Sequence, residues 1–174
     1  MRKIFVFLMF LLAAGAVFAA SIEDDPGPPI APGVTADAIH VDKSERTLTL
    51  MKDGQPLKTY AIAIGGGGDG PKRREGDRLT PEGDYTITGR NPNSIAHLSL
   101  RTSYPSPADV ASAEERGEPP GGDIMIHGIP NGFSFLGPLH RRSDWTDGCI
   151  AVTNAEMDEI WRVVPDGTPI RIDP

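Results

Sequence analysis

The chemistry of this chain centres on one thiol and one imidazole. Cys149 is the only cysteine among 174 residues, and it lies between Gly148 and a short apolar run. A thiolate attacks carbonyl carbon readily, but little of an ordinary thiol is ionised near neutral pH, so the site needs a base or local positive charge. His127 ends an earlier apolar run and could be that base if folding brings the two side chains within hydrogen-bond reach. The alternative is that Cys149 is a buried apolar filler and His127 is structural.

The histidines do not indicate a metal centre. The chain has four of them, and none follows the H-E-x-x-H spacing or another zinc-ligand spacing. We therefore expect neither a metal nor another cofactor. The remaining histidines, His40, His97 and His140, lack an obvious sequence partner, and we expect the first two to be structural.

Alternating apolar residues predict the strands that would position Cys149 and His127. A three-stranded meander is predicted around the pairs Ile39/Val41, Leu48/Leu50 and Ile62/Ile64, with turns at 42–46 and 52–56. Further strands are predicted at 85–88, 94–100, 124–126, 150–152 and 168–172. The site residues would then lie at strand ends, where a sheet edge or a cleft opens.

One helix is strongly indicated after the second site strand. Thr153 and Glu156 match a capping box, and apolar residues follow at helical spacing up to Pro165. A short helix is possible at 108–116. The segments 65–70 and 132–137 are predicted to be loops. The first is a glycine run, but it lacks the Gly-Lys-Ser/Thr ending of a phosphate-binding loop, so we expect a plain loop there. The chain should be mainly β with one clear C-terminal helix.

The N-terminus is typical of an exported protein. Arg2 and Lys3 precede an apolar run and small residues, which predicts a signal peptide over 1–19, cut after Ala19 or alternatively Ala20. An uncleaved anchor is the other interpretation, although the apolar run is short for a bilayer. A Pro-rich linker is predicted over 20–37 and the catalytic domain over 38–174. After cleavage we expect no stable membrane insertion.

The charge balance and the single cysteine limit the partners and the crosslinks. The formal net charge is −7 and becomes more negative when the two basic leader residues are removed, so nucleic acid is not an expected partner. One cysteine allows no internal disulfide.

The residues around His127 and Cys149 resemble those of a known family. His127-Gly128 followed by Thr146-Asp147-Gly148-Cys149-Ile150 is similar to the active-site signature of the L,D-transpeptidases with the YkuD-type catalytic domain. The resemblance extends through T-P-E-G-D-Y, N-P-N-S, L-S-L-R-T-S-Y-P and D-W-T-D-G-C-I-A-V-T-N, over about 39–172. It implies a β-sandwich or partly barrel-like domain. Many members have histidine where Asp147 stands and asparagine or arginine where Ala151 stands.

The resemblance also implies roles for these residues. Cys149 would be the nucleophile and His127 the base and proton shuttle, with the Gly128 carbonyl orienting the imidazole. The backbone N–H groups of Gly148 and Cys149 are candidates for the oxyanion hole, and Thr146 and Asp147 belong to the same motif. An acidic Asp147 would make the turn less electropositive, which leaves the stabilisation of the thiolate open.

The implied activity is peptidoglycan remodelling. The thiol would attack the carbonyl of the third residue in a donor stem tetrapeptide, expel D-alanine, and pass the acyl group to an amine of another stem or of an envelope lipoprotein. Transfer to water would instead make a carboxypeptidase, and an amidase releasing lipoprotein is a related alternative. Such a protein is expected in the periplasm or cell envelope. The alternative from another class is a wall-binding module with an inert cysteine.

Five further residues are weaker candidates for substrate binding. His140, Arg141 and Arg142 could form a cationic loop that holds stem carboxylates, or a plain solvated loop. Trp145 could line the pocket, although packing is the commoner role. Tyr104 is a candidate contact residue with the same packing alternative.

Overall fold

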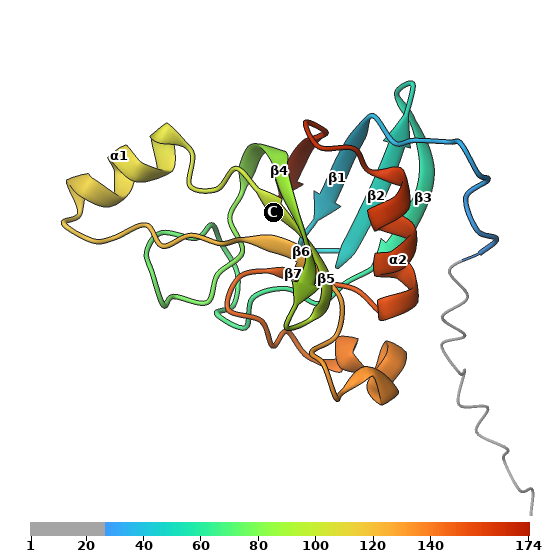
Figure 1. Cartoon of the computed structure of the whole chain (residues 1–174). Coiled ribbons are helices and arrows are strands. Elements are labelled where there is room, and N and C mark those ends of the chain that lie inside the picture. The colour runs from blue at the N-terminus through green and yellow to red at the C-terminus, as the bar shows by residue number, and fades with distance from the viewer. Residues whose placement is uncertain (1–26) are drawn as a thin grey trace, which may run out of the picture.

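The computed structural model describes residues 27–174 (Figure 1). The predicted signal peptide and the first part of the predicted linker lie outside this range. The strands are β1 (Ala38–Asp42), β2 (Thr47–Lys52), β3 (Gln55–Ala61), β4 (Gly83–Ser94), β5 (His97–Thr102), β6 (Met125–His127), β7 (Ile150–Ala151) and β8 (Pro169–Asp173). The helices are α1 (Pro107–Glu115), the 3₁₀ segment η1 (Ser134–Arg142) and α2 (Asn154–Val163).

The described strands form one mixed sheet. Its order is β3-β2-β1-β8-β4-β5-β6-β7, in which β1 runs parallel to β8 and β6 runs parallel to β7. The other neighbours are antiparallel. The prediction of a mainly β domain is therefore confirmed.

The third strand of the meander lies earlier than predicted. It ends at Ala61, before the pair Ile62 and Ile64, and both isoleucines are buried. Single bridges beyond the strand join Ala63 to Ala151 and Gly65 to Thr146. The continuation of β3 therefore contacts β7 and its preceding turn at the far edge of the sheet. The edges approach each other, which gives the sheet its partly closed, barrel-like form.

Several other boundaries differ from the pattern-based prediction. Strand β4 is longer than predicted because it pairs with β8 at its start and with β5 further on. The segment predicted to be a loop at 132–137 contains the start of η1, which is interrupted at Gly137 by non-helical backbone. Helix α1 begins at a capping box of Ser106 and Asp109, and it extends away from the sheet (Figure 1).

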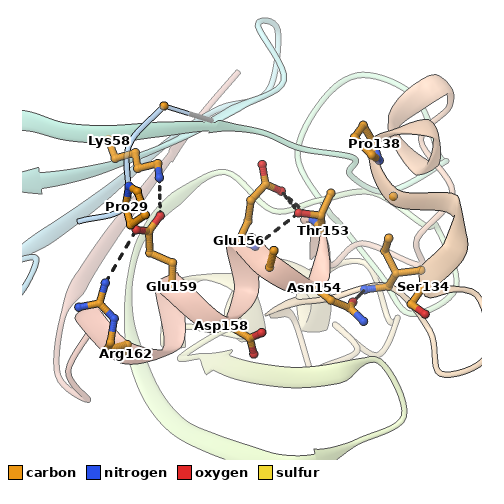
Figure 2. A pocket seen from close by; sticks show the side chains of 14 residues that line it. Pro29, Lys58, Ser134, Pro138, Thr153, Asn154, Glu156, Asp158, Glu159 and Arg162 are labelled. Carbon is orange, nitrogen blue, oxygen red and sulfur yellow. Dashed lines mark hydrogen bonds and ion pairs between the residues drawn. The ribbon is translucent and has the colours of Figure 1, made fainter. Parts of the chain in front are cut away.

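Helix α2 begins as the sequence predicts. Thr153 is its N-cap, and the Glu156 side chain accepts hydrogen bonds from the Thr153 backbone and hydroxyl (Figure 2). Met157, Ile160 and Val163 are fully buried and join the main hydrophobic core. The helix therefore covers the sheet and fixes the chain directly after β7.

The described part of the predicted linker, residues 27–37, packs on the domain. Ile30 is buried, and its backbone N–H donates to Glu159 of α2. Glu159 also accepts from Lys58 at 2.6 Å (Figure 2) and from the Tyr60 hydroxyl at 2.8 Å. This portion is thus tied to α2 and β3 and does not behave as a free linker. Within residues 27–174, no helix combines the length and apolar character needed to cross a bilayer.

Candidate active site

The two site strands bring His127 and Cys149 to the same face of the sheet. The register of the β6 and β7 pair places Ile126 beside Ile150 and His127 beside Ala151. Ile126 and Ile150 point into the core, so the side chain of His127 points to the opposite face. Cys149 directly precedes β7, and alternation places its side chain on the face shared with His127.

The imidazole of His127 is held in one tautomer. Its Nδ1 lies 2.6 Å from the carbonyl oxygen of Gly128, and a carbonyl can only accept, so Nδ1 carries the proton. Burial lowers the pKa of His127 below its usual value, and the bond to Gly128 opposes this only in part. The ring is therefore neutral near pH 7, with Nε2 as the basic nitrogen.

Gly128 is required by the packing around it. A Cβ at this position would lie 2.7 Å from Oδ1 of Asn154 and 2.9 Å from Cβ of His97. The same Asn154 oxygen accepts from the Ile129 N–H at 2.8 Å. The first turn of α2 thus fixes the backbone that orients His127.

The thiol of Cys149 is free and partly buried. Its Sγ donates to the carbonyl oxygen of Asp123 at 3.4 Å. Burial is the main cause that raises the pKa of this thiol, and the carboxylates of Asp147 and Asp123 raise it further. The Met125 backbone N–H and the Lys72 ammonium lower the pKa, but only in part. In this structure the site therefore holds a neutral thiol and a neutral imidazole, and not a preformed ion pair.

The turn before Cys149 is closed by Thr146. The Thr146 hydroxyl donates to the Cys149 carbonyl at 2.7 Å and accepts from the Gly148 N–H at 3.2 Å. Gly148 has a φ of +119°, a conformation that favours glycine. Because Thr146 already occupies the Gly148 N–H, the Cys149 N–H is the better candidate for an oxyanion-hole donor.

Asp147 points to solvent and is paired with Arg78. The Arg78 Nε donates to Asp147 Oδ1 at 3.0 Å, and its Nη2 donates to the Trp145 carbonyl at 3.1 Å. The Asp147 side chain is 89% exposed. Its charge is therefore partly balanced and well solvated.

Trp145 contacts two histidines. Its ring makes edge contacts with His127 and His140, at centroid distances of 5.8 and 6.3 Å. Its indole N–H also approaches His140 Nδ1 at 3.4 Å. Trp145 and His140 line a mainly apolar hollow of about 410 Å³ that also includes Ile129 and Leu139. Trp145 therefore both packs against the candidate base and lines a pocket.

The cationic loop expected from His140, Arg141 and Arg142 is largely absent. His140 is buried, and burial together with nearby Arg141 lowers its pKa to about 4, so it is neutral. Arg141 forms a buried ion pair with Glu156. Only Arg142 of the three is an exposed cation. Burial against α2 is the physical reason for the difference.

Tyr104 is a packing residue in this structure. It is buried, its ring makes an edge contact with Tyr85, and its hydroxyl donates to the Pro120 carbonyl at 2.7 Å. His40 and His97 have carboxylate partners, Asp173 and Asp158, that sequence inspection did not identify.

Four groups around the thiol and its turn were not found from the sequence: the Asp123 carbonyl, the Met125 N–H, the Lys72 ammonium and the guanidinium of Arg78. Two of these are backbone groups, which a residue pattern does not mark. The charged run K-R-R-E-G-D-R, residues 72–78, was the available signal for both Lys72 and Arg78.

A hollow of about 710 Å³ is separate from the thiol. It lies along α2, between η1 and the segment around Pro29, and its lining includes Lys58, Glu159 and Arg162 (Figure 2). Neither Cys149 nor His127 lines it. Among residues 27–174, no group of three or more His, Cys, Asp or Glu side chains is arranged to hold a metal ion.

Comparison with known proteins decides the family. The model of the YkuD family, the L,D-transpeptidase catalytic domain, matches residues 36–172. The chain belongs to the L,D-transpeptidase catalytic domain family. It is 34% identical over 132 residues to the putative L,D-transpeptidase YafK of Escherichia coli strain K12, covering 72% of this chain and 46% of that protein. It is 28% identical over 141 residues to the putative L,D-transpeptidase YkuD of Bacillus licheniformis, covering 78% and 65%.

Solved structures share the fold. The helical cell shape determining protein Pgp2 of Campylobacter jejuni aligns with a TM-score of 0.61 at 25% identity, over 81% of this chain and 48% of that one. Bd1075 of Bdellovibrio bacteriovorus aligns with a TM-score of 0.54 at 25% identity, over 85% and 51%. The family domain thus accounts for nearly all of the described residues, while this chain spans about half the length of the E. coli relative.

Proposed function

We propose that this chain is an L,D-transpeptidase that acylates Cys149 with a peptidoglycan stem peptide and transfers the acyl group to an amine. The observation that carries the proposal is the shared sheet face of Cys149 and His127, together with the Gly128 carbonyl that leaves Nε2 of His127 as the base. Membership of the L,D-transpeptidase family supports the substrate class.

The first half-reaction follows from the protonation states. His127 Nε2 takes the thiol proton as Sγ of Cys149 bonds to the carbonyl carbon of the third stem residue, and the carbonyl oxygen becomes an oxyanion. The Cys149 N–H is the proposed hydrogen-bond donor to that charge. The carbon–nitrogen bond to the terminal D-alanine then breaks, and the imidazolium donates its proton to the leaving amine, which leaves a thioester.

The second half-reaction uses the same base. His127 accepts a proton from the attacking amine, the carbon–sulfur bond breaks, and the thiol is regenerated. An amine of another stem gives a crosslink, and an amine of a lipoprotein gives protein attachment. Water at the same position gives L,D-carboxypeptidase activity, and reversal at an existing lipoprotein link gives amidase activity.

Two features are candidate substrate contacts. The hollow beside Trp145 reaches the ring that contacts His127, so an acceptor bound there would be near the base. Arg142 is exposed on the segment between the site residues and could pair with a stem carboxylate.

We extend the proposal to location. A signal peptide over 1–19 would deliver the enzyme to the periplasm or cell envelope, where its substrate lies. N-terminal sequencing of the mature protein, with Ala20 or Ser21 as the expected first residue, tests this part.

The direct test incubates purified muropeptides with wild type, Cys149→Ala and His127→Ala, and analyses the products by mass spectrometry. Crosslinked dimers indicate transpeptidation, loss of D-alanine alone indicates carboxypeptidation, and shortened links indicate an amidase. We expect Cys149→Ala to abolish every product and His127→Ala to cost nearly as much. Equal turnover in wild type and Cys149→Ala would refute the proposal, and an inert thiol with wall binding would favour a binding module.

A further inference from the structure

A buried ion pair lies in the segment between the glycine run and β4. Lys72 Nζ donates to Asp77 Oδ1 at 2.8 Å and to the Arg74 carbonyl at 3.0 Å. The two side chains are only 3% and 9% exposed. Removing two charges from water costs several kcal/mol per ion, so a buried pair is weak evidence for stability and calls for another explanation.

Asp77 organises the whole segment. Besides Lys72, it accepts the backbone N–H groups of Arg73, Arg74 and Leu79 at 2.7 to 3.1 Å. Burial alone would raise the pKa of Asp77, but these hydrogen bonds outweigh it and bring the pKa to about 2. The carboxylate is therefore ionised, and it holds residues 72–79 in one conformation.

This segment packs against residues 146–149, which we call the nucleophile turn after the proposed role of Cys149. A Cβ on Gly148 would lie 2.6 Å from the Leu79 carbonyl oxygen, so the two backbones are in direct contact. A Cβ on Gly65 would meet both the Arg78 carbonyl and Gly148 Cα. The Arg78 side chain adds its bonds to Asp147 and to the Trp145 carbonyl. A shift of the segment would therefore move the residue directly before Cys149.

Lys72 also lies beside Gly121, in the segment that precedes β6. Its Cε lies 3.4 Å from the position that a Cβ on Gly121 would take. Gly121 is two residues before Asp123, whose carbonyl accepts the thiol hydrogen of Cys149. The Glu75 N–H donates to the Pro119 carbonyl at 2.8 Å, which joins the two segments.

The charges around the sulfur are mixed. From the segment before β6 come the Asp123 carboxylate, paired with Arg101, and the Met125 N–H. From the turn itself comes Asp147, paired with Arg78, and His127 on β6 is neutral. The Lys72 ammonium lowers the pKa of Cys149, whereas the two carboxylates raise it. The Asp77 carboxylate, which pairs with Lys72, also accepts three backbone N–H groups.

We propose that Lys72 is a positioning residue for Cys149: anchored by Asp77, it holds the 72–79 segment against the nucleophile turn and provides a fixed positive charge for the thiolate. The consequence for turnover rests on the proposed function, whereas the effect on the thiol is measurable without substrate.

The test measures the rate of Cys149 alkylation by iodoacetamide as a function of pH. Lys72→Gln keeps a polar group able to bond Asp77 but removes the charge, and Lys72→Arg keeps the charge. Lys43→Gln is the matched control, because the Lys43 side chain is 4% exposed, close to the 3% of Lys72, and it pairs with Glu82 and bonds the carbonyls of Gly70 and Thr80.

We expect Lys72→Gln to move the alkylation midpoint up by about 0.5 to 1 pH unit, the shift expected when a nearby opposite charge is removed. Lys72→Arg should restore most of the wild-type midpoint, and Lys43→Gln should leave it unchanged. Circular dichroism confirms that each variant is folded. A folded Lys72→Gln with the wild-type midpoint, or an equal shift in Lys43→Gln, would overturn the inference.

Muropeptide turnover separates this inference from the proposed function. A midpoint shift in Lys72→Gln with a wild type inactive on every muropeptide would support the role of Lys72 and reject only the transpeptidase proposal. If wild type is active on muropeptides but Lys72→Gln leaves the alkylation midpoint unchanged, the transpeptidase proposal is supported and the role of Lys72 is rejected.

Discussion

Replacement of Thr146 by valine tests how the nucleophile turn is held. The Thr146 hydroxyl makes two hydrogen bonds within the turn, one to the Cys149 carbonyl and one from the Gly148 N–H, and the residue is only 4% exposed. Valine keeps the shape of the side chain and removes both bonds. Each bond contributes about 1 kcal/mol, and a buried group left unpaired costs about 1 to 3 kcal/mol.

We therefore expect Thr146→Val to lower the free energy of unfolding by about 2 to 4 kcal/mol. Because the turn carries Cys149, turnover should fall by about tenfold or more, as small misplacements of reacting groups do. Urea unfolding followed by circular dichroism gives the first quantity, and D-alanine release from muropeptides gives the second.

Thr146→Ser is the matched control. It keeps the hydroxyl and both hydrogen bonds and loses one buried methyl group, which should cost about 1 kcal/mol. Its turnover should stay close to that of wild type. If serine proved more damaging than valine, the methyl packing and not the hydroxyl would hold the turn, and the reasoning would be refuted.

Three further predictions concern protonation and packing. The pKa of about 4 for buried His140 lies below its usual value of 6.5, so the unfolded chain binds the proton first as pH falls. Stability should therefore be retained above pH 6.5 and fall by about 3 kcal/mol toward pH 4 in urea unfolding, with a flatter profile in His140→Phe. For catalysis, the lowered pKa of His127 predicts that kcat/KM falls on the acid side with a midpoint below about 6.5; a higher midpoint would contradict a buried neutral base. Tyr104→Phe removes the bond to the Pro120 carbonyl and should cost about 1 kcal/mol of stability without changing turnover, whereas a raised KM would return Tyr104 to the substrate site.

The sequence predicted what local patterns can encode. The capping box of Thr153 and Glu156, the apolar face of α2, the short strand that ends at His127 and the short strand that follows Cys149 all depend on residues within a few positions of one another. The family resemblance, confirmed by the match to residues 36–172, supplied the link between two residues on different strands.

Other features depend on contacts that local patterns do not reveal. Glu156 caps α2, and the sequence gives no sign that it also pairs with Arg141. Because of this ion pair, Arg141 is not the free cation of the loop that the sequence had predicted. Ile62 and Ile64 alternate like strand residues, but they follow β3 because the chain there turns to contact β7. The backbone packing of Leu79 against Gly148 joins segments about 70 residues apart and leaves no mark in either.

The bridges from Ala63 and Gly65 to the strand and turn around Cys149 have a consequence for how the enzyme matures. They join parts of the chain more than 80 residues apart, and such distant pairings form slowly because a large loop must close first. The turn that carries Cys149 therefore acquires these neighbours only when the first and last thirds of the domain have both folded. Under the proposed function, a newly made chain would carry an ordinary cysteine, and transfer of an acyl group to it would require the completed structure.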